Sequence, residues 1–136
     1  MKALLFTISL LLASSLFAKD VIEDTTTSLL WQDAQANKDL AVTFFQAQDY
    51  CKDLVIAEYK DFRLPTLLEL QSIIDYDNYK PAILKGFLYA ANETYWTTTL
   101  FADDDTEVWT IHFKKGARSV KGKHYDRNVR CVQKLK

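Results

Sequence analysis

Apolar and polar residues alternate along this chain with two periods, and the helical one is clearest after Pro65. Pro65 is disfavoured inside a helix, so a helix can begin only after it. Thr66 and Glu69 match a capping box, in which each side chain accepts a hydrogen bond from the other residue's backbone amide. The apolar positions that follow have helical spacing: Leu67, Leu70, Ile73 and Ile74. We expect a helix there with one buried face.

An earlier helix is predicted by the same two signals. Thr43 and Gln46 form a second capping-box pair. The predicted buried face of this helix consists of Phe44, Ala47, Cys51, Leu54 and Val55.

The period-two alternation predicts strands. An entry strand spans residues 21–32 and includes a polar turn at 25–28, and four more strands span 95–100, 108–113, 118–121 and 128–135. Turns are expected at 103–105 and at 114–116, where Gly116 can take a positive φ. The pattern predicts an α+β fold, with two helices packed on mostly antiparallel β-sheets.

The N-terminus has the pattern of a signal peptide. Lys2 precedes an apolar core at residues 3–12, which is too short for a membrane span, and Ala18 is the best cleavage point. We expect residues 1–18 to be the signal peptide and residues 19–136 a single domain, with a retained membrane anchor as the alternative. The mature protein would then be periplasmic or secreted, without membrane insertion.

Charge is unevenly distributed although the net charge is −1. Residues 114–136 contain nine basic side chains and a single acidic one, Asp126, whereas the preceding part is strongly acidic. Much of this charge can pair across a small domain, and part of it can form a basic face.

Several motifs in chain order resemble one bacterial family. They are LLWQ at 29–32, YC at 50–51, DFRLPTLLELQSIIDY at 61–76, YWTTT at 95–99, VWTIHFKKG at 108–116 and NVRCVQ at 128–133. Together they resemble the Lcl C-terminal domain family, also called DUF1566, which takes its name from a collagen-like adhesin. The family is similar in fold to C-type lectins.

The resemblance implies structural roles for several residues. In C-type lectins a disulfide joins the first helix to the final strand, and Cys51 and Cys131 match those places. Export also favours this pairing, because disulfides persist in oxidising compartments. Trp31, Trp96 and Trp109 match core positions, although sugar stacking is their alternative role. Arg63, beside Pro65, is expected to make a buried bidentate pair with a carboxylate or with carbonyls, and Asp61, Glu69 and Asp75 are its candidate partners.

No residue pattern indicates catalysis. The two histidines, His112 and His124, lack metal-site spacing, and no serine or cysteine is placed for a triad. The aspartates at 103–105 resemble a hairpin turn more than a calcium site. We therefore expect no enzyme activity, no cofactor and no metal.

The sequence predicts an exported binding module. Its partner would be a glycan, including anionic or sulfated ones, or an envelope or surface protein, and we expect no nucleic-acid partner. A structural subunit of a cell-envelope assembly with no small ligand is the alternative. The expected ligand-binding residues come mostly from the basic segment: Lys114, Lys115, Arg118, Lys121, Lys123, Tyr125 and Arg127.

Overall fold

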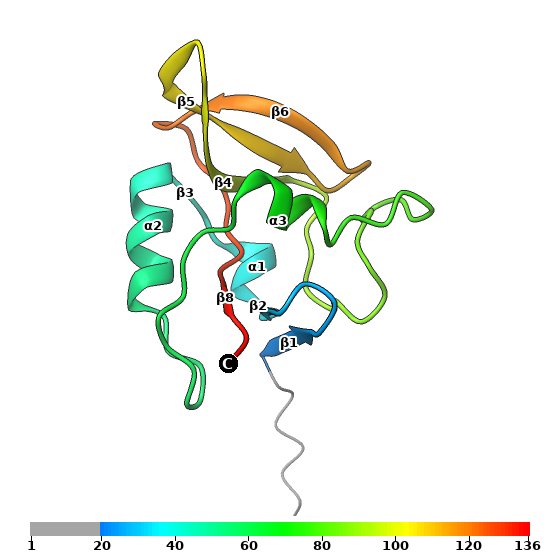
Figure 1. The fold of residues 1–136 in the computed structure, drawn as a ribbon. Helices are drawn as coiled ribbons and strands as arrows, with labels where there is room; N and C mark the ends of the chain where they lie inside the picture. The colour runs from blue at the N-terminus through cyan, green and yellow to red at the C-terminus, as the bar shows by residue number, and fades with distance from the viewer. Residues whose placement is uncertain (1–19) are drawn as a thin grey trace, which may run out of the picture.

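The computed structural model describes residues 20–136, which form eight strands and three helices (Figure 1). In chain order these are β1 (Val21–Asp24), β2 (Leu29–Gln32), α1 (Ala36–Asp39), β3 (Ala41–Val42), α2 (Phe44–Asp53), α3 (Leu67–Gln71), β4 (Thr94–Phe101), β5 (Asp104–His112), β6 (Ala117–Gly122), β7 (Arg127–Asn128) and β8 (Val132–Lys134). One sheet has the order β1-β2-β8 and the other β3-β7-β4-β5-β6. All neighbouring strands are antiparallel except β4 and β7, so the expected α+β class with mostly antiparallel sheets is confirmed.

Both capping boxes are present. Thr43 and Gln46 cap α2, and Thr66 and Glu69 cap α3, with the reciprocal hydrogen bonds formed in each case. The predicted extents of the helices were less accurate. Helix α2 ends before Val55, which is 65% exposed and not part of the buried face.

Helix α3 is shorter than its apolar pattern suggests, because it ends at Gln71. Ile73 and Ile74 are buried as expected, but they lie beyond the helix, where Ile74 pairs with Ile83 in an isolated bridge. Apolar spacing therefore identified the buried residues correctly and the helix end incorrectly.

Two predicted strands are each divided in the structure. Residues 21–32 form an antiparallel hairpin of β1 and β2 around the polar turn. The predicted last strand supplies β7 to the five-stranded sheet and β8 to the three-stranded sheet. The segment from β7 to β8 therefore links the two sheets. Arg130 and Cys131 lie between these strands, and both are buried where the segment passes from one sheet to the other. The short elements α1 and β3 were not predicted.

The core lies on both faces of β4. The adjacent residues Tyr95 and Trp96 point to opposite faces, and both are fully buried. Tyr95 packs in a cluster with Trp31, and Trp96 packs in a second cluster with Phe44 and Cys51. Trp109 differs from the other two tryptophans, because it is only partly buried. The expected core role is therefore complete for Trp31 and Trp96 and partial for Trp109.

Cys51 and Cys131 form a disulfide, as predicted. The bond joins α2 to the residue immediately before β8. Both cysteines are buried in the second core cluster, and Cys131 lies between β7 of one sheet and β8 of the other. The expected signal peptide lies outside the described residues. Within residues 20–136, no helix is long and apolar enough to cross a membrane.

Candidate ligand-binding groove

The seven residues expected to bind ligand are not gathered in one place. Lys114 and Lys115 lie in the turn after β5, where they line a small hollow with His112 and Ala117. Arg118 lies over the ring of Trp109, with the guanidinium carbon 5.6 Å from the ring centre.

Lys123 lies against two other aromatic rings. Its ammonium is 5.4 Å from the ring centre of Phe44 and 6.0 Å from that of Phe45. It also interacts with Asp104, whose pKa is lowered mainly by hydrogen bonds from Thr106 and slightly by the charge of Lys123. The Lys123 ammonium therefore already interacts with two aromatic rings and a carboxylate of the same domain.

Two of the remaining predicted residues, Lys121 and Arg127, line a groove of about 360 Å³. Lys121 comes from β6 and Arg127 from β7, and Tyr125 lies between them in the connecting loop. The groove is lined by Ala41, Glu93, Thr94, Lys121, Asp126, Arg127 and Asn128. Glu93 and Thr94 were not predicted as neighbours of the basic segment, since only the pairing between β4 and β7 brings them there.

The groove carries two cations and two carboxylates that do not pair with each other. Only two ion pairs form among residues 20–136, Arg63–Glu69 and Arg130–Asp33, and neither lies in this groove. Lys121, Arg127, Glu93 and Asp126 therefore keep charged groups available to a ligand. They offer hydrogen-bond donors and acceptors within one site.

An exposed aromatic ring, that of Tyr125, lies against one of the lining residues, Arg127. The guanidinium carbon of Arg127 lies 5.6 Å from the ring centre of Tyr125, and Arg127 Nη1 donates a hydrogen bond of 2.7 Å to the carbonyl of Asp126. The Tyr125 residue is 64% exposed. A Cβ at Gly122 would lie only 3.2 Å from this ring, so glycine lets the ring lie close to the backbone.

Asn128, which lines the groove, belongs to a buried polar network. Asn128 Nδ2 donates to the carbonyls of Lys38 at 3.1 Å and Asn37 at 3.4 Å. Asn37 Nδ2 in turn donates to Gln32 Oε1 at 2.8 Å and to the carbonyl of Val129 at 2.9 Å. The Tyr95 hydroxyl also donates to the carbonyl of Asn37, and its burial raises the Tyr95 pKa. This network fixes β7 relative to α1.

Arg130 belongs to the same interior, although its sequence neighbours are basic surface residues. The Arg130 side chain is 1% exposed and pairs with Asp33, with Nη1 3.2 Å from Oδ1. It also donates to the carbonyls of Gln32 and Tyr89 and lies over the ring of Phe87. Burial is the main influence on the Arg130 pKa and lowers it.

Asp33 extends this pairing to the loop that precedes β4. Its carboxylate accepts hydrogen bonds from the amides of Leu88 at 2.9 Å and Tyr89 at 3.1 Å. The buried pair therefore joins β2, the chain before β8 and this loop. No local sequence pattern indicates this pair, because Asp33 and Arg130 are 97 positions apart.

Arg63 makes the predicted bidentate pair, and its partner is Glu69, with Nη–Oε distances of 2.7 and 2.8 Å. The expected burial is wrong, since the Arg63 side chain is 47% exposed. The hydrogen bonds from Arg63 are the largest influence on the Glu69 pKa and lower it. Because Glu69 also closes the capping box, Arg63 stabilises the start of α3 from the surface. Pro65 is buried beside it and accepts a hydrogen bond from the Thr98 amide.

The aspartate run lies at the β4–β5 hairpin. Asp104 is the first residue of β5, and its Oδ1 accepts hydrogen bonds from both the amide and the hydroxyl of Thr106. In the part of the chain that the structure describes, no three His, Cys, Asp or Glu side chains are grouped as metal ligands.

The sequence was compared with models of known protein families. Residues 20–133 match the Lcl C-terminal domain, so the chain belongs to the Lcl C-terminal domain family. Comparison with curated proteins gave no match.

Proposed function

We propose that this protein is an exported, non-catalytic module that binds a glycan in the groove between β6 and β7. The observation that carries the proposal is the set of four unpaired charged side chains, Lys121, Arg127, Glu93 and Asp126, beside an exposed aromatic ring. Sugar hydroxyls donate and accept hydrogen bonds, and the apolar face of a sugar ring stacks on aromatic side chains. A groove with both kinds of charge, and with a tyrosine ring against Arg127, suits such a ligand.

The balance of charges also narrows the expected ligand. Two carboxylates offset two cations, so the groove favours a neutral or weakly charged glycan over a polysulfated chain.

The proposal includes a C-type-lectin-like fold and export through residues 1–18. The disulfide from α2 to the start of the last strand supports the first part, because it matches the bridge expected for such a fold. The same disulfide supports export, since structural disulfides are typical of oxidising compartments.

A glycan array with the purified, oxidised protein tests the proposal. We expect specific hits that Tyr125→Ala weakens and that Tyr76→Ala, a matched change at another exposed tyrosine, leaves unchanged. A blank array would contradict glycan binding. Hits that are equal in both variants would contradict this groove as the site.

A protein partner is the second candidate, and a different surface favours it. Tyr76, Tyr79 and Leu88 are large, exposed side chains on the loops between α3 and β4. Exposed apolar side chains of this kind are typical of protein interfaces. A blank array together with a partner in a cross-linking pull-down, lost in a Tyr79→Ser/Leu88→Ser variant, would favour this function.

A further inference from the structure

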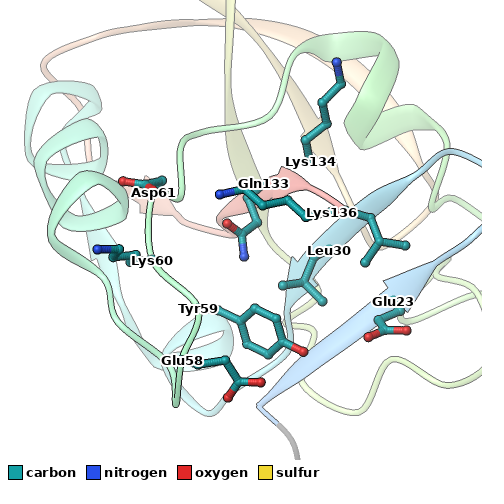
Figure 2. Close-up of a pocket in the computed structure, with 10 residues that line it drawn as sticks. Glu23, Leu30, Glu58, Tyr59, Lys60, Asp61, Gln133, Lys134 and Lys136 are labelled. Carbon is teal, nitrogen blue, oxygen red and sulfur yellow. The ribbon is translucent and has the colours of Figure 1, made fainter.

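A second cleft, of about 270 Å³, lies between the three-stranded sheet and the segment that precedes Phe62 (Figure 2). Its sheet side is one row of paired residues across three strands, Glu23 on β1, Leu30 on β2 and Gln133 on β8. Its other wall is formed by Glu58, Tyr59, Lys60 and Asp61. It shares no lining residue with the groove described above.

Gln133 gives this cleft a specific polar group. The residue is only 8% exposed, and its side-chain amide makes no hydrogen bond to another described residue. Its polar atoms reach the solvent in the cleft, since within residues 20–136 only Trp31 Nε1 and Arg130 Nε are buried side-chain atoms without a partner. Figure 2 shows the amide pointing into the cleft between Tyr59 and Lys136. An amide on a largely buried residue that opens into a cleft can exchange its water contacts for a ligand group, so Gln133 is a candidate ligand contact.

Charged side chains of both signs line the cleft, and Asp61 lies on the same side as Lys136 (Figure 2). In Figure 2, Glu23 and Glu58 lie at the end near the Tyr59 hydroxyl, and the Lys136 ammonium lies at the opposite end. None of these three groups forms an ion pair within the described part of the chain. Leu30 and the Tyr59 ring provide apolar surface between the two ends.

We propose that this cleft binds a small zwitterion with the chemistry of an amino acid or a dipeptide. The ligand ammonium would lie near Glu23 and Glu58, and its carboxylate near Lys136. A peptide group or carboxylate oxygen would accept a hydrogen bond from Gln133, and an apolar side chain would contact Leu30 and Tyr59. The volume is below the range of drug-sized ligand pockets, which agrees with a ligand of this size.

Titration of the purified protein with glycyl-leucine, followed by calorimetry and by amide NMR shifts, tests the proposal. We expect saturable binding with shifts at Glu23, Tyr59 and Gln133. Acetylating the peptide amine or amidating its carboxylate should each weaken binding about tenfold, because each change removes one charge contact.

Two variants and two controls locate the site. Gln133→Leu should lower the affinity about tenfold, whereas Gln48→Leu, the same change at an exposed position of α2, should not. Glu58→Lys, at an exposed site where folding is not at risk, should lower it as well. Tyr125→Ala in the groove should have no effect, so this proposal and glycan binding can fail independently.

The absence of saturable binding would overturn the proposal. Equal affinity for glycyl-leucine and its two capped forms would overturn the zwitterionic ligand. Unchanged affinity in both Gln133→Leu and Glu58→Lys would overturn this cleft as the site.

Discussion

Arg63 and Arg130 have burial opposite to that suggested by their neighbours in the sequence. Arg63 precedes a Leu-Pro pair in an apolar stretch and is half exposed, whereas Arg130 lies in a basic run and is buried. The difference depends on the partner, because Asp33 approaches Arg130 only through the pairing of β2 with β8. The energetic importance expected for Arg63 therefore belongs to Arg130.

The first prediction concerns this buried pair. Arg130→Met should lower the free energy of unfolding by about 3–5 kcal/mol, because it leaves the Asp33 carboxylate buried without its counter-charge. Urea unfolding at pH 7 measures the change. Arg118→Met is the matched control on the exposed face of Trp109 and should cost about 1 kcal/mol or less. Equal losses in the two variants would mean that the pair has no special role.

The second prediction concerns the surface pair of Arg63 and Glu69. The folded-state pKa of Glu69 is lowered, so the pair stabilises the protein above the unfolded pKa, and this contribution is lost as the pH falls through the folded pKa. Solvent screens Arg63, so Glu69→Gln should cost about 1 kcal/mol or less at pH 7. The difference from the unmodified protein should disappear in acid.

Thermal unfolding from pH 7 to pH 3 checks this pH dependence. Glu58→Gln, which removes an exposed carboxylate that forms no ion pair in the described chain, is the control. A difference that is constant with pH for Glu69→Gln would contradict the assigned role of its charge.

At the scale of elements, sequence reasoning succeeded where the signal is local. Both capping boxes depend on side chains three positions apart, and both were located correctly. It failed where long-range pairing decides the outcome. Residues 128–135 were predicted as one strand, yet β7 pairs with β3 and β4 and β8 pairs with β2.

The same distinction applies to the candidate groove. Lys121, Tyr125 and Arg127 are close in the sequence and were predicted together. Glu93 meets them only because β4 runs beside β7, and its carboxylate changes the charge of the site. Local composition thus predicted a basic face, and topology gives a mixed groove.

The third prediction concerns the covalent link between elements. Replacing Cys51 and Cys131 together by alanine should lower the free energy of unfolding by about 4 kcal/mol, because the disulfide closes a loop across 80 positions in the unfolded chain. Reduction of the unmodified protein should give a similar loss, and both are measured by urea unfolding. A loss below about 1 kcal/mol in both experiments would show that the link is not a main source of stability.

At the scale of the whole molecule, folding distributes the cations of residues 114–136 over several separate sites. Arg130 pairs with Asp33 in the interior, and Lys123 lies near Asp104. Arg118 and Arg127 each lie over an aromatic ring. The cations of residues 114–136 therefore occupy separate environments, and a polyanion would meet them only in part.

The last prediction follows from this arrangement and concerns heparin as a probe polyanion. Glu93→Gln/Asp126→Asn should raise heparin affinity up to about tenfold at low salt, because it leaves Lys121 and Arg127 without nearby carboxylates, and each exposed charge contact contributes about 1 kcal/mol or less. The gain should fall as salt rises. Asp103→Asn/Asp105→Asn makes the same change in net charge at the hairpin between β4 and β5 and should have a smaller effect. Equal gains in both variants would show that heparin responds to the net charge of the molecule and not to the groove.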